Sequence, residues 1–193
     1  RELVKQRSGD VPVAYLVGKA WFFSMELTVT RYVLIPRPDT ETLVEYVIQQ
    51  VRQRPAWAGE RTPAILDVGT GSGAIAVSLA KHIGTAAVTA TDISEKALAV
   101  ARGNAEGQGV AERVTFLRGD LLAPLEGAAA PGLFQVIAAN PPYIPSAAVE
   151  KLAPGIRDHE PRVALDGGMD GMAVHRRIVA EAKRHLAPGG MLI

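Results

Sequence analysis

This chain of 193 residues contains no cysteine, and no run of about 18 apolar residues that could span a bilayer. Without cysteine, neither a disulfide framework nor a thiolate-ligated metal site can form. Aromatic residues make up only 5% of the chain and the formal net charge is +1, so the footprint of a nucleic-acid-binding surface is also missing. The 48% of apolar residues, by contrast, suffice for a hydrophobic core and exclude disorder as the dominant state.

Both ends of the sequence predict a part of a longer protein. The chain opens on Arg1 with neither an initiator methionine nor a signal peptide. It stops at residues 191–193, which are typical of the start of a strand after the turn at residues 188–190. Because a half-made strand would leave an unpaired sheet edge, we expect the chain to be truncated within its fifth strand.

Strands and helices alternate in the second part of the chain. The predicted strands cover residues 64–68, 86–91, 114–117, 134–139 and 191–193. The predicted helices cover residues 74–82, 95–105 with Ser94 as the cap, and 170–186. Such alternation predicts right-handed βαβ crossovers and an α/β fold: a doubly wound, mostly parallel, Rossmann-like sheet.

The first part of the chain is less regular. Short β-like pieces are predicted at residues 20–23 and 27–29. A helix with one apolar face should follow, capped by Asp39 or Thr40 and closed by Pro55. A loop is predicted at residues 127–132, which are rich in glycine and alanine.

The ends of the first two parallel strands carry features of a nucleoside site, where open parallel sheets bind their ligands. Residues 67–73, Asp-Val-Gly-Thr-Gly-Ser-Gly, allow a tight turn with exposed amides at a helix start. Asp92 lies 21 positions after Gly71, near the offset at which an acid holds a ribose hydroxyl pair. Because the loop also satisfies the G-x-G-x-x-G/A fingerprint, a nicotinamide enzyme stays possible at this point.

The tetrad Asn140-Pro141-Pro142-Tyr143, at the end of the fourth strand, decides between these classes. Its prolines remove two N–H donors and leave carbonyls free to accept, Asn140 adds a side-chain acceptor, and Tyr143 adds a flat face. If the strand order is 3-2-1-4-5, the tetrad abuts the glycine loop. Acceptors that converge in this way suit a planar –NH₂ group, which a nicotinamide enzyme has no need to clamp.

These motifs resemble those of class I S-adenosylmethionine-dependent methyltransferases that act on planar amino nitrogens: adenine-N6, guanine-N2 and protein glutamine-N5. The tetrad alone cannot separate the three groups. The flanking segments 7–18, 33–41 and 160–171 closely resemble the peptide chain release factor glutamine-N5 methyltransferases. The resemblance implies that residues 1–35 are a linker and short β-hairpin after a missing helical domain. Residues 36–193 would then be the catalytic domain, without its C-terminal strands.

The resemblance also implies the chemistry: methyl transfer from S-adenosylmethionine to the Gly-Gly-Gln glutamine of class 1 release factors. Asn140 and the Pro141 carbonyl would accept the amide N–H bonds, Pro142 would hold the loop and Tyr143 would pack against the amide. The residues that it assigns to the cofactor are Asp67, Gly69, Thr70, Gly71, Ser72, Gly73, Asp92, Asp120, Leu121 and Asn140.

Asp67 would face either the cofactor through water or the loop's own amides. Leu121 stands where relatives often have an aromatic residue, so the adenine would have apolar contact without ring stacking. Arg37 and Thr40 would line the substrate side, although Arg37 could equally be a surface ion-pair partner.

Other functions stay open at this point. A ribosomal protein glutamine methyltransferase is the hardest to exclude; the low charge argues against a nucleic-acid methyltransferase, and the intact tetrad against a module that only binds. The expected partners are release factors, without direct nucleic acid or membrane, and we expect a cytoplasmic monomer. The four histidines lack metal-ligand spacing, so no metal is expected, and residues 166–171 should form a turn rather than a calcium loop.

Overall fold

The centre of the protein is a five-stranded parallel sheet with the strand order β5-β4-β3-β6-β7. The computed structural model describes all residues except 1, 55–56, 58–61 and 127–131. The strands are β3 (Ala64–Val68), β4 (Ala87–Asp92), β5 (Val114–Arg118), β6 (Phe134–Ala139) and β7 (Leu186–Leu192). The doubly wound α/β fold and the expected strand order are confirmed, and the switch point lies between β3 and β6.

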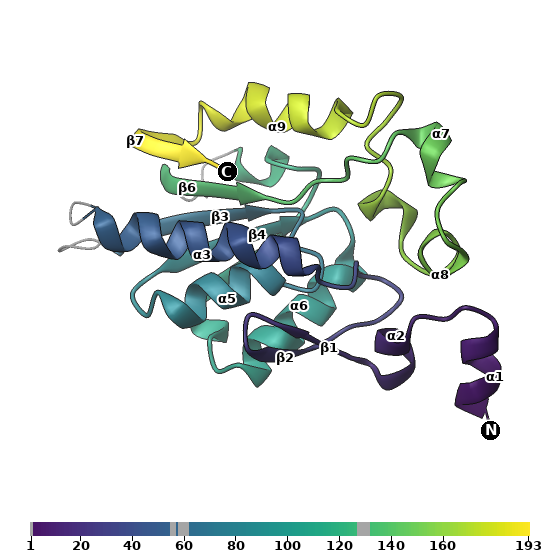
Figure 1. Cartoon of the computed structure of the whole chain (residues 1–193). Coiled ribbons are helices and arrows are strands. Elements are labelled where there is room, and N and C mark those ends of the chain that lie inside the picture. The colour runs from purple at the N-terminus through teal and green to yellow at the C-terminus, as the bar shows by residue number, and fades with distance from the viewer. Residues whose placement is uncertain (1, 55–56, 58–61, 127–131) are drawn as a thin grey trace.

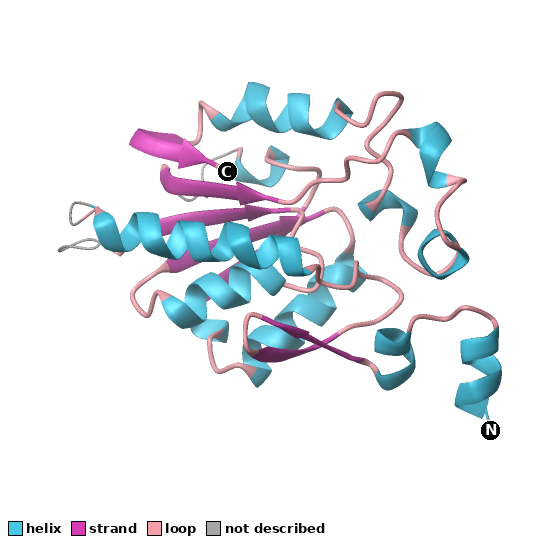
Figure 2. Cartoon of the chain, viewed as in Figure 1, coloured by secondary structure: helices cyan, strands magenta, loops and turns pink. Residues whose placement is uncertain are grey.

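Helices cover both faces of this sheet, as Figures 1 and 2 show. One face carries α3 (Pro38–Gln53), α5 (Ala74–His82) and α6 (Glu95–Gly107), and the other carries α9 (Ala173–Ala182) and the short η2 (Ala123–Leu125). Ile65 belongs to the first hydrophobic cluster and Leu66 to the second, as the alternation of side chains along a strand requires. Strands covered on both faces explain the nearly continuous apolar runs of the sequence.

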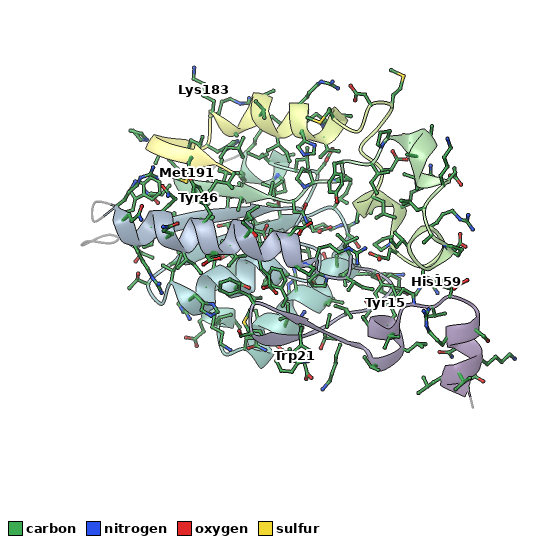
Figure 3. All side chains as sticks on the ribbon, in the orientation of Figure 1. Tyr15, Trp21, Tyr46, His159, Lys183 and Met191 are labelled. Atoms are coloured by element: carbon green, nitrogen blue, oxygen red, sulfur yellow. The ribbon has the colours of Figure 1, made fainter. Side chains whose placement is uncertain are left out.

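The remaining elements surround the carboxyl ends of the strands or flank α6. They are α1 (Glu2–Ser8), α2 (Val13–Val17), the hairpin β1 (Lys19–Phe22) and β2 (Met25–Thr28), η1 (Ala111–Arg113), α7 (Ser146–Val149), α8 (Pro154–Arg157) and η3 (Arg162–Ala164). Figure 1 shows α7 and α8 beyond the carboxyl ends of the strands. The His159 ring contacts the Gly9 carbonyl at 3.0 Å, and Figure 3 shows His159 and Tyr15 on this side of the molecule.

Two helix predictions need correction. Helix α3 begins at Pro38 and its N-cap, Arg37, makes no side-chain cap, so Asp39 and Thr40 lie inside the first turn rather than at the cap. Proline is preorganised for the first helical position, where its missing N–H costs nothing. The helix predicted over residues 170–186 is only α9, because Asp170 accepts from the Met172 amide in a turn before it and Leu186 already belongs to β7.

The turn predicted at residues 188–190 is also wrong, because these residues lie within β7. The ladder with β6 shifts register there: Phe134 pairs with Leu186, whereas Val136 pairs with Met191. An irregular strand at the sheet edge tolerates Pro188, and Gly189 adopts a φ of 74°. The predictions for Pro55 and the loop from residue 127 concern residues outside the described part. Among the described residues, no helix has the length and apolar character that crossing a membrane needs.

Candidate active site

The glycine loop after β3 is tied to the end of β4. The amides of Gly69 and Thr70 both donate to the Thr91 carbonyl, each at 2.9 Å. Gly69 and Gly71 have φ values of 74° and 56°, which side chains rarely adopt, and a Cβ at either position would point into open space. The loop therefore presents bare backbone to the space above the sheet.

Gly73, which is predicted to bind the cofactor, has a packing role. A Cβ on this residue would lie 3.1 Å from the Ala101 Cβ, so a glycine is what lets α5 approach α6 so closely. Gly73 also has a φ of 81° and is the N-cap of α5. It is not among the residues that line the cavity described below, and its contact with a cofactor stays a prediction.

Asp67 is fully buried beneath the loop. One oxygen, Oδ2, accepts from the Thr70 hydroxyl at 2.6 Å and from the Ala76 amide at 3.1 Å. Burial raises the pKa of this carboxyl to about 7, against the lowering effect of both hydrogen bonds. Of the two roles left open for Asp67, the structure shows the bonding of the loop and of the α5 amide. Asp67 does not line the cavity, and its contact with a cofactor stays a prediction.

Asp92, at the end of β4, faces the cavity from the other side of the loop. Its Oδ2 accepts from the Gly71 amide at 2.9 Å, and its Oδ1 accepts from the Ser94 amide at 2.8 Å. Burial is the main cause that raises the pKa of this carboxyl. Since each carboxylate oxygen can accept more than one hydrogen bond, Asp92 can hold the loop and still accept from a ligand.

A cavity of about 350 Å³ opens between the loop, Asp92 and the tetrad. The sequence-predicted residues that line it are Gly69, Thr70, Gly71, Ser72, Asp92, Asp120, Leu121, Asn140, Pro141 and Pro142. Arg177 donates to Asp120 Oδ2 at 2.7 Å at one edge of this cavity. Leu121 has a φ of 51°, a strained conformation for a residue with a side chain, and such strain often marks a ligand site.

A second cavity, of about 430 Å³, lies on the α3 side of the tetrad. Tyr143 lines this cavity but not the first, and Asn140 and Pro141 line both. Arg37 and Thr40 also line both cavities. The two cavities thus meet at the Asn140–Pro141 peptide, which joins the glycine-loop side to the α3 side.

The side chain of Asn140 is oriented by α3. Its Nδ2 donates to the Thr40 hydroxyl at 3.1 Å, so its Oδ1 stays available as an acceptor. Arg37, one turn earlier, donates to Glu160 Oε1 at 2.6 Å, and the Glu160 side chain is only 1% exposed. Arg37 is therefore both a cavity-lining residue and the partner of a buried carboxylate, not of a surface one.

Sequence reasoning missed part of the cavity wall. The additional lining residues of the first cavity include Tyr32, Val33, Leu34, Pro36, Val163, Ala164, Val174 and Arg177. Several belong to the flanking segments 33–41 and 160–171. The sequence of these segments resembles that of a known family, but it does not show that these residues face the site. The Tyr15 hydroxyl donates to the Val33 carbonyl at 2.6 Å and fixes that part of the wall. Among the described residues, no group of acidic or histidine side chains could hold a metal ion.

Comparison with known proteins identifies the class. A family model described as "Methyltransferase domain" matches residues 65–159. Ribosomal protein L11 methylase from Lactobacillus delbrueckii subsp. bulgaricus has a similar structure, with a TM-score of 0.53, 22% identity, and coverage of 81% of this chain and 59% of that one. The hMettl16 catalytic domain is similar with a TM-score of 0.59, 15% identity, and coverage of 84% and 58%. At these identities the likeness is one of fold alone. The fold and the family model together define a Rossmann-like methyltransferase domain.

Sequence relatives narrow the family. A release factor glutamine methyltransferase of Gloeobacter violaceus is 46% identical over 182 residues, which cover 94% of this chain and 60% of that protein. A relative of the same name in Moorella thermoacetica is 46% identical over 191 residues, which cover 99% of this chain and 64% of that protein. Over almost its whole length the chain is similar to these release factor glutamine methyltransferases, and it spans about three fifths of their length.

Proposed function

We propose that this chain transfers the methyl group of S-adenosylmethionine to the N5 amide nitrogen of a protein glutamine, the Gly-Gly-Gln glutamine of class 1 peptide chain release factors. The observation that carries this proposal is the position of Asn140 and Pro141, which line both cavities. A methyl donor on one side and an acceptor on the other would meet at this peptide. The names of the relatives support the choice of acceptor.

The first cavity fits the proposed cofactor in the chemistry of its lining. Asp92 offers a carboxylate for a ribose hydroxyl pair, and Ile93 and Leu121 offer apolar contact for a base. The open space at Gly69 and Gly71 admits the methionine part against bare backbone. S-adenosylmethionine supplies a methyl group on a positively charged sulfur, which makes it ready for attack by a nucleophile.

The second cavity would receive the glutamine side chain. An amide nitrogen is a poor nucleophile because its lone pair is delocalised into the carbonyl. Asn140 Oδ1 and the Pro141 carbonyl would each accept a hydrogen bond from one N–H group of the glutamine amide. These two hydrogen bonds would orient the nitrogen and favour the positive charge that develops on it. Tyr143, which lines this second cavity, would pack against the amide plane.

Orientation, rather than a general base, would supply most of the rate enhancement. Neither cavity has a histidine among its lining residues. Correct placement of two reacting groups is by itself worth several orders of magnitude in rate. The proton that leaves the methylated nitrogen can then pass to water after the transfer.

The test is a transfer assay with labelled S-adenosylmethionine and four acceptors: a class 1 release factor, a ribosomal protein mixture, ribosomal RNA and duplex DNA. We expect label on the release factor, mapped to the Gly-Gly-Gln glutamine by mass spectrometry. The matched control is the same release factor with alanine in place of that glutamine, which should stay unlabelled. Label on a ribosomal protein or on nucleic acid, with none on the release factor, would overturn the proposal.

A further inference from the structure

The segment of residues 165–171, which follows η3, runs alongside residues 142–146. The Ile144 amide donates to the Leu165 carbonyl at 3.0 Å, and the Gly167 amide donates to the Ile144 carbonyl at 2.8 Å. Ile144 and Asp166 form an isolated parallel bridge. The Ser146 amide then donates to the Gly168 carbonyl at 2.9 Å, so the pairing continues through four residues.

Side chains add to this pairing. The Ser146 hydroxyl donates to Asp166 Oδ1 at 2.6 Å, and the Gly168 amide donates to the same oxygen at 3.0 Å. Asp166 also receives a hydrogen bond from the Arg162 guanidinium at 3.3 Å. These charge-assisted contacts hold the pKa of Asp166 below its usual range, so the carboxylate stays ionised at neutral pH.

The glycines of the segment touch the tetrad itself. A Cβ on Gly167 would lie 2.7 Å from the Pro142 carbonyl oxygen and 2.4 Å from that of Gly171. A Cβ on Gly171 would lie 2.3 Å from the Tyr143 carbonyl oxygen. All three distances are too short for real atoms, so a side chain at either position must shift the segment against the backbone of the tetrad.

The tetrad depends on such neighbours because of its own composition. Pro141 and Pro142 have no N–H, so their peptide units cannot be held by hydrogen bonds that they donate. The backbone that carries the proposed acceptor carbonyl is instead fixed at Ile144 by pairing, and at residues 142–143 by close packing against the glycines.

We propose that Gly167 and Gly171 are positioning residues for methyl transfer: their bare backbone sets the place of the Pro142 and Tyr143 carbonyls, and hence of Asn140 and Pro141. This inference rests on the function proposed above. It assigns to residues 166–171, which the sequence presents as a simple turn, the support of the acceptor side of the site. The glycine loop follows β3 and Asp92 ends β4, and neither contacts Gly167 or Gly171.

The test compares Gly171→Ala with Gly109→Ala. Both glycines have positive φ, 77° and 69°, but a Cβ at Gly109 meets no atom within 4 Å. The two variants thus share the backbone strain, and only Gly171→Ala pushes on Tyr143. Because small misplacement at a reacting centre is costly, we expect Gly171→Ala to lower kcat by about 10-fold or more relative to Gly109→Ala. The KM and the Kd for S-adenosylmethionine should stay within about twofold, since neither Gly171 nor Tyr143 lines the first cavity.

A second readout does not need activity. Amide hydrogen exchange of Ile144 and Ser146 should be faster in Gly171→Ala than in Gly109→Ala, because the displaced backbone breaks their pairing. Equal kcat in the two variants, or a parallel loss of cofactor affinity, would overturn the inference. If the wild type labels no release factor, the proposed function fails, whereas the positioning contact is still decided by the exchange rates.

A milder variant covers the case in which Gly171→Ala does not fold. Ser146→Ala removes the hydrogen bond to Asp166 without adding an atom. We expect it to lower kcat by about threefold and to leave the Kd for S-adenosylmethionine unchanged. An unaltered kcat, with unaltered exchange at Ser146, would contradict the positioning role.

Discussion

The two sides of the site are constructed differently. On the glycine-loop side, hydrogen bonds join residues that are close in sequence: Asp67 bonds residues 3 and 9 positions away, and Asp92 bonds Gly71, 21 positions away. On the tetrad side, Thr40 and Asn140 are 100 positions apart, and Arg37 and Glu160 are 123 apart. The Asp67 and Asp92 contacts of the glycine loop are thus more local than the Thr40–Asn140 and Arg37–Glu160 contacts of the tetrad side, which join distant segments.

Burial and charge differ in the same way. Asp67 is completely buried, and burial raises its pKa. On the tetrad side, Tyr143 is 63% exposed, and Asp170 pairs with Arg176 in solvent, which lowers the pKa of that carboxyl to about 2. The contrast is thus between a buried carboxyl under the loop and exposed side chains beside the tetrad.

The largest effect should come from Asn140→Ala. The variant removes one acceptor of the proposed amide clamp, so we expect methyl transfer to fall by about 10²- to 10³-fold. Affinity for S-adenosylmethionine, measured by calorimetry, should fall much less than the rate, because the glycine loop and Asp92 are untouched although Asn140 also lines the first cavity. Unchanged methylation by this variant would refute the assignment of the tetrad. A loss of cofactor affinity as large as the loss of rate would show that Asn140 acts mainly in binding the cofactor.

The next effect concerns the pH dependence of stability. Asp67 has a pKa of about 7 when folded and an ordinary value near 3.8 when unfolded, so the folded protein binds the extra proton between these pH values. The free energy of unfolding should therefore fall as pH rises, by about 3 kcal/mol between pH 4.5 and 7.

The matched variant is Asp67→Asn, which keeps an acceptor for Thr70 and for the Ala76 amide but cannot ionise. Urea unfolding at several pH values should show that this variant lacks the decline that the wild type shows. Parallel curves for the two proteins would mean that Asp67 does not titrate in this range.

Asp92→Asn should weaken the cofactor side alone. Hydrogen bonds to charged groups contribute about 1.5–3 kcal/mol each, so we expect a roughly 10- to 100-fold higher Kd for S-adenosylmethionine. At saturating cofactor, kcat should stay near that of the wild type. The control is Glu26→Gln, which changes a surface carboxylate paired with Lys19 and should leave both quantities unaltered. A loss confined to kcat would contradict the proposed division of the site.

The smallest effect is expected at Thr40. Thr40→Val removes the hydroxyl that accepts from Asn140 Nδ2, so the Asn140 amide loses one fixed contact worth about 1 kcal/mol. We expect kcat to fall by about fivefold, with rescue in Thr40→Ser, which restores the hydroxyl. Steady-state kinetics of the two variants decide the matter: equal rates for valine and serine would show that the hydroxyl does not orient Asn140.

Much of the fold could be predicted, for reasons that particular elements show. The bounds of β3, α5 and β6 follow from their apolar runs and from the glycine loop, and Ser94 caps α6 by accepting from the Ala97 amide. Failures came where tertiary contacts act: Thr40 looks like a cap in sequence, but its hydroxyl bonds Asn140 instead. The register shift in β7 could not be predicted either, because it depends on the pairing with β6.

By itself, the sequence determined the order of strands and helices, the glycine loop with Asp92, and the tetrad with its two donor-free prolines. These features are local, and hydrophobic periodicity and backbone chemistry act over a few residues. Only the tertiary structure decided that Thr40 and Arg37 meet Asn140 and Glu160, and that the glycines of residues 167–171 press on the tetrad. The physical reason is that these contacts form between distant segments only when the packed sheet and its helices bring them together.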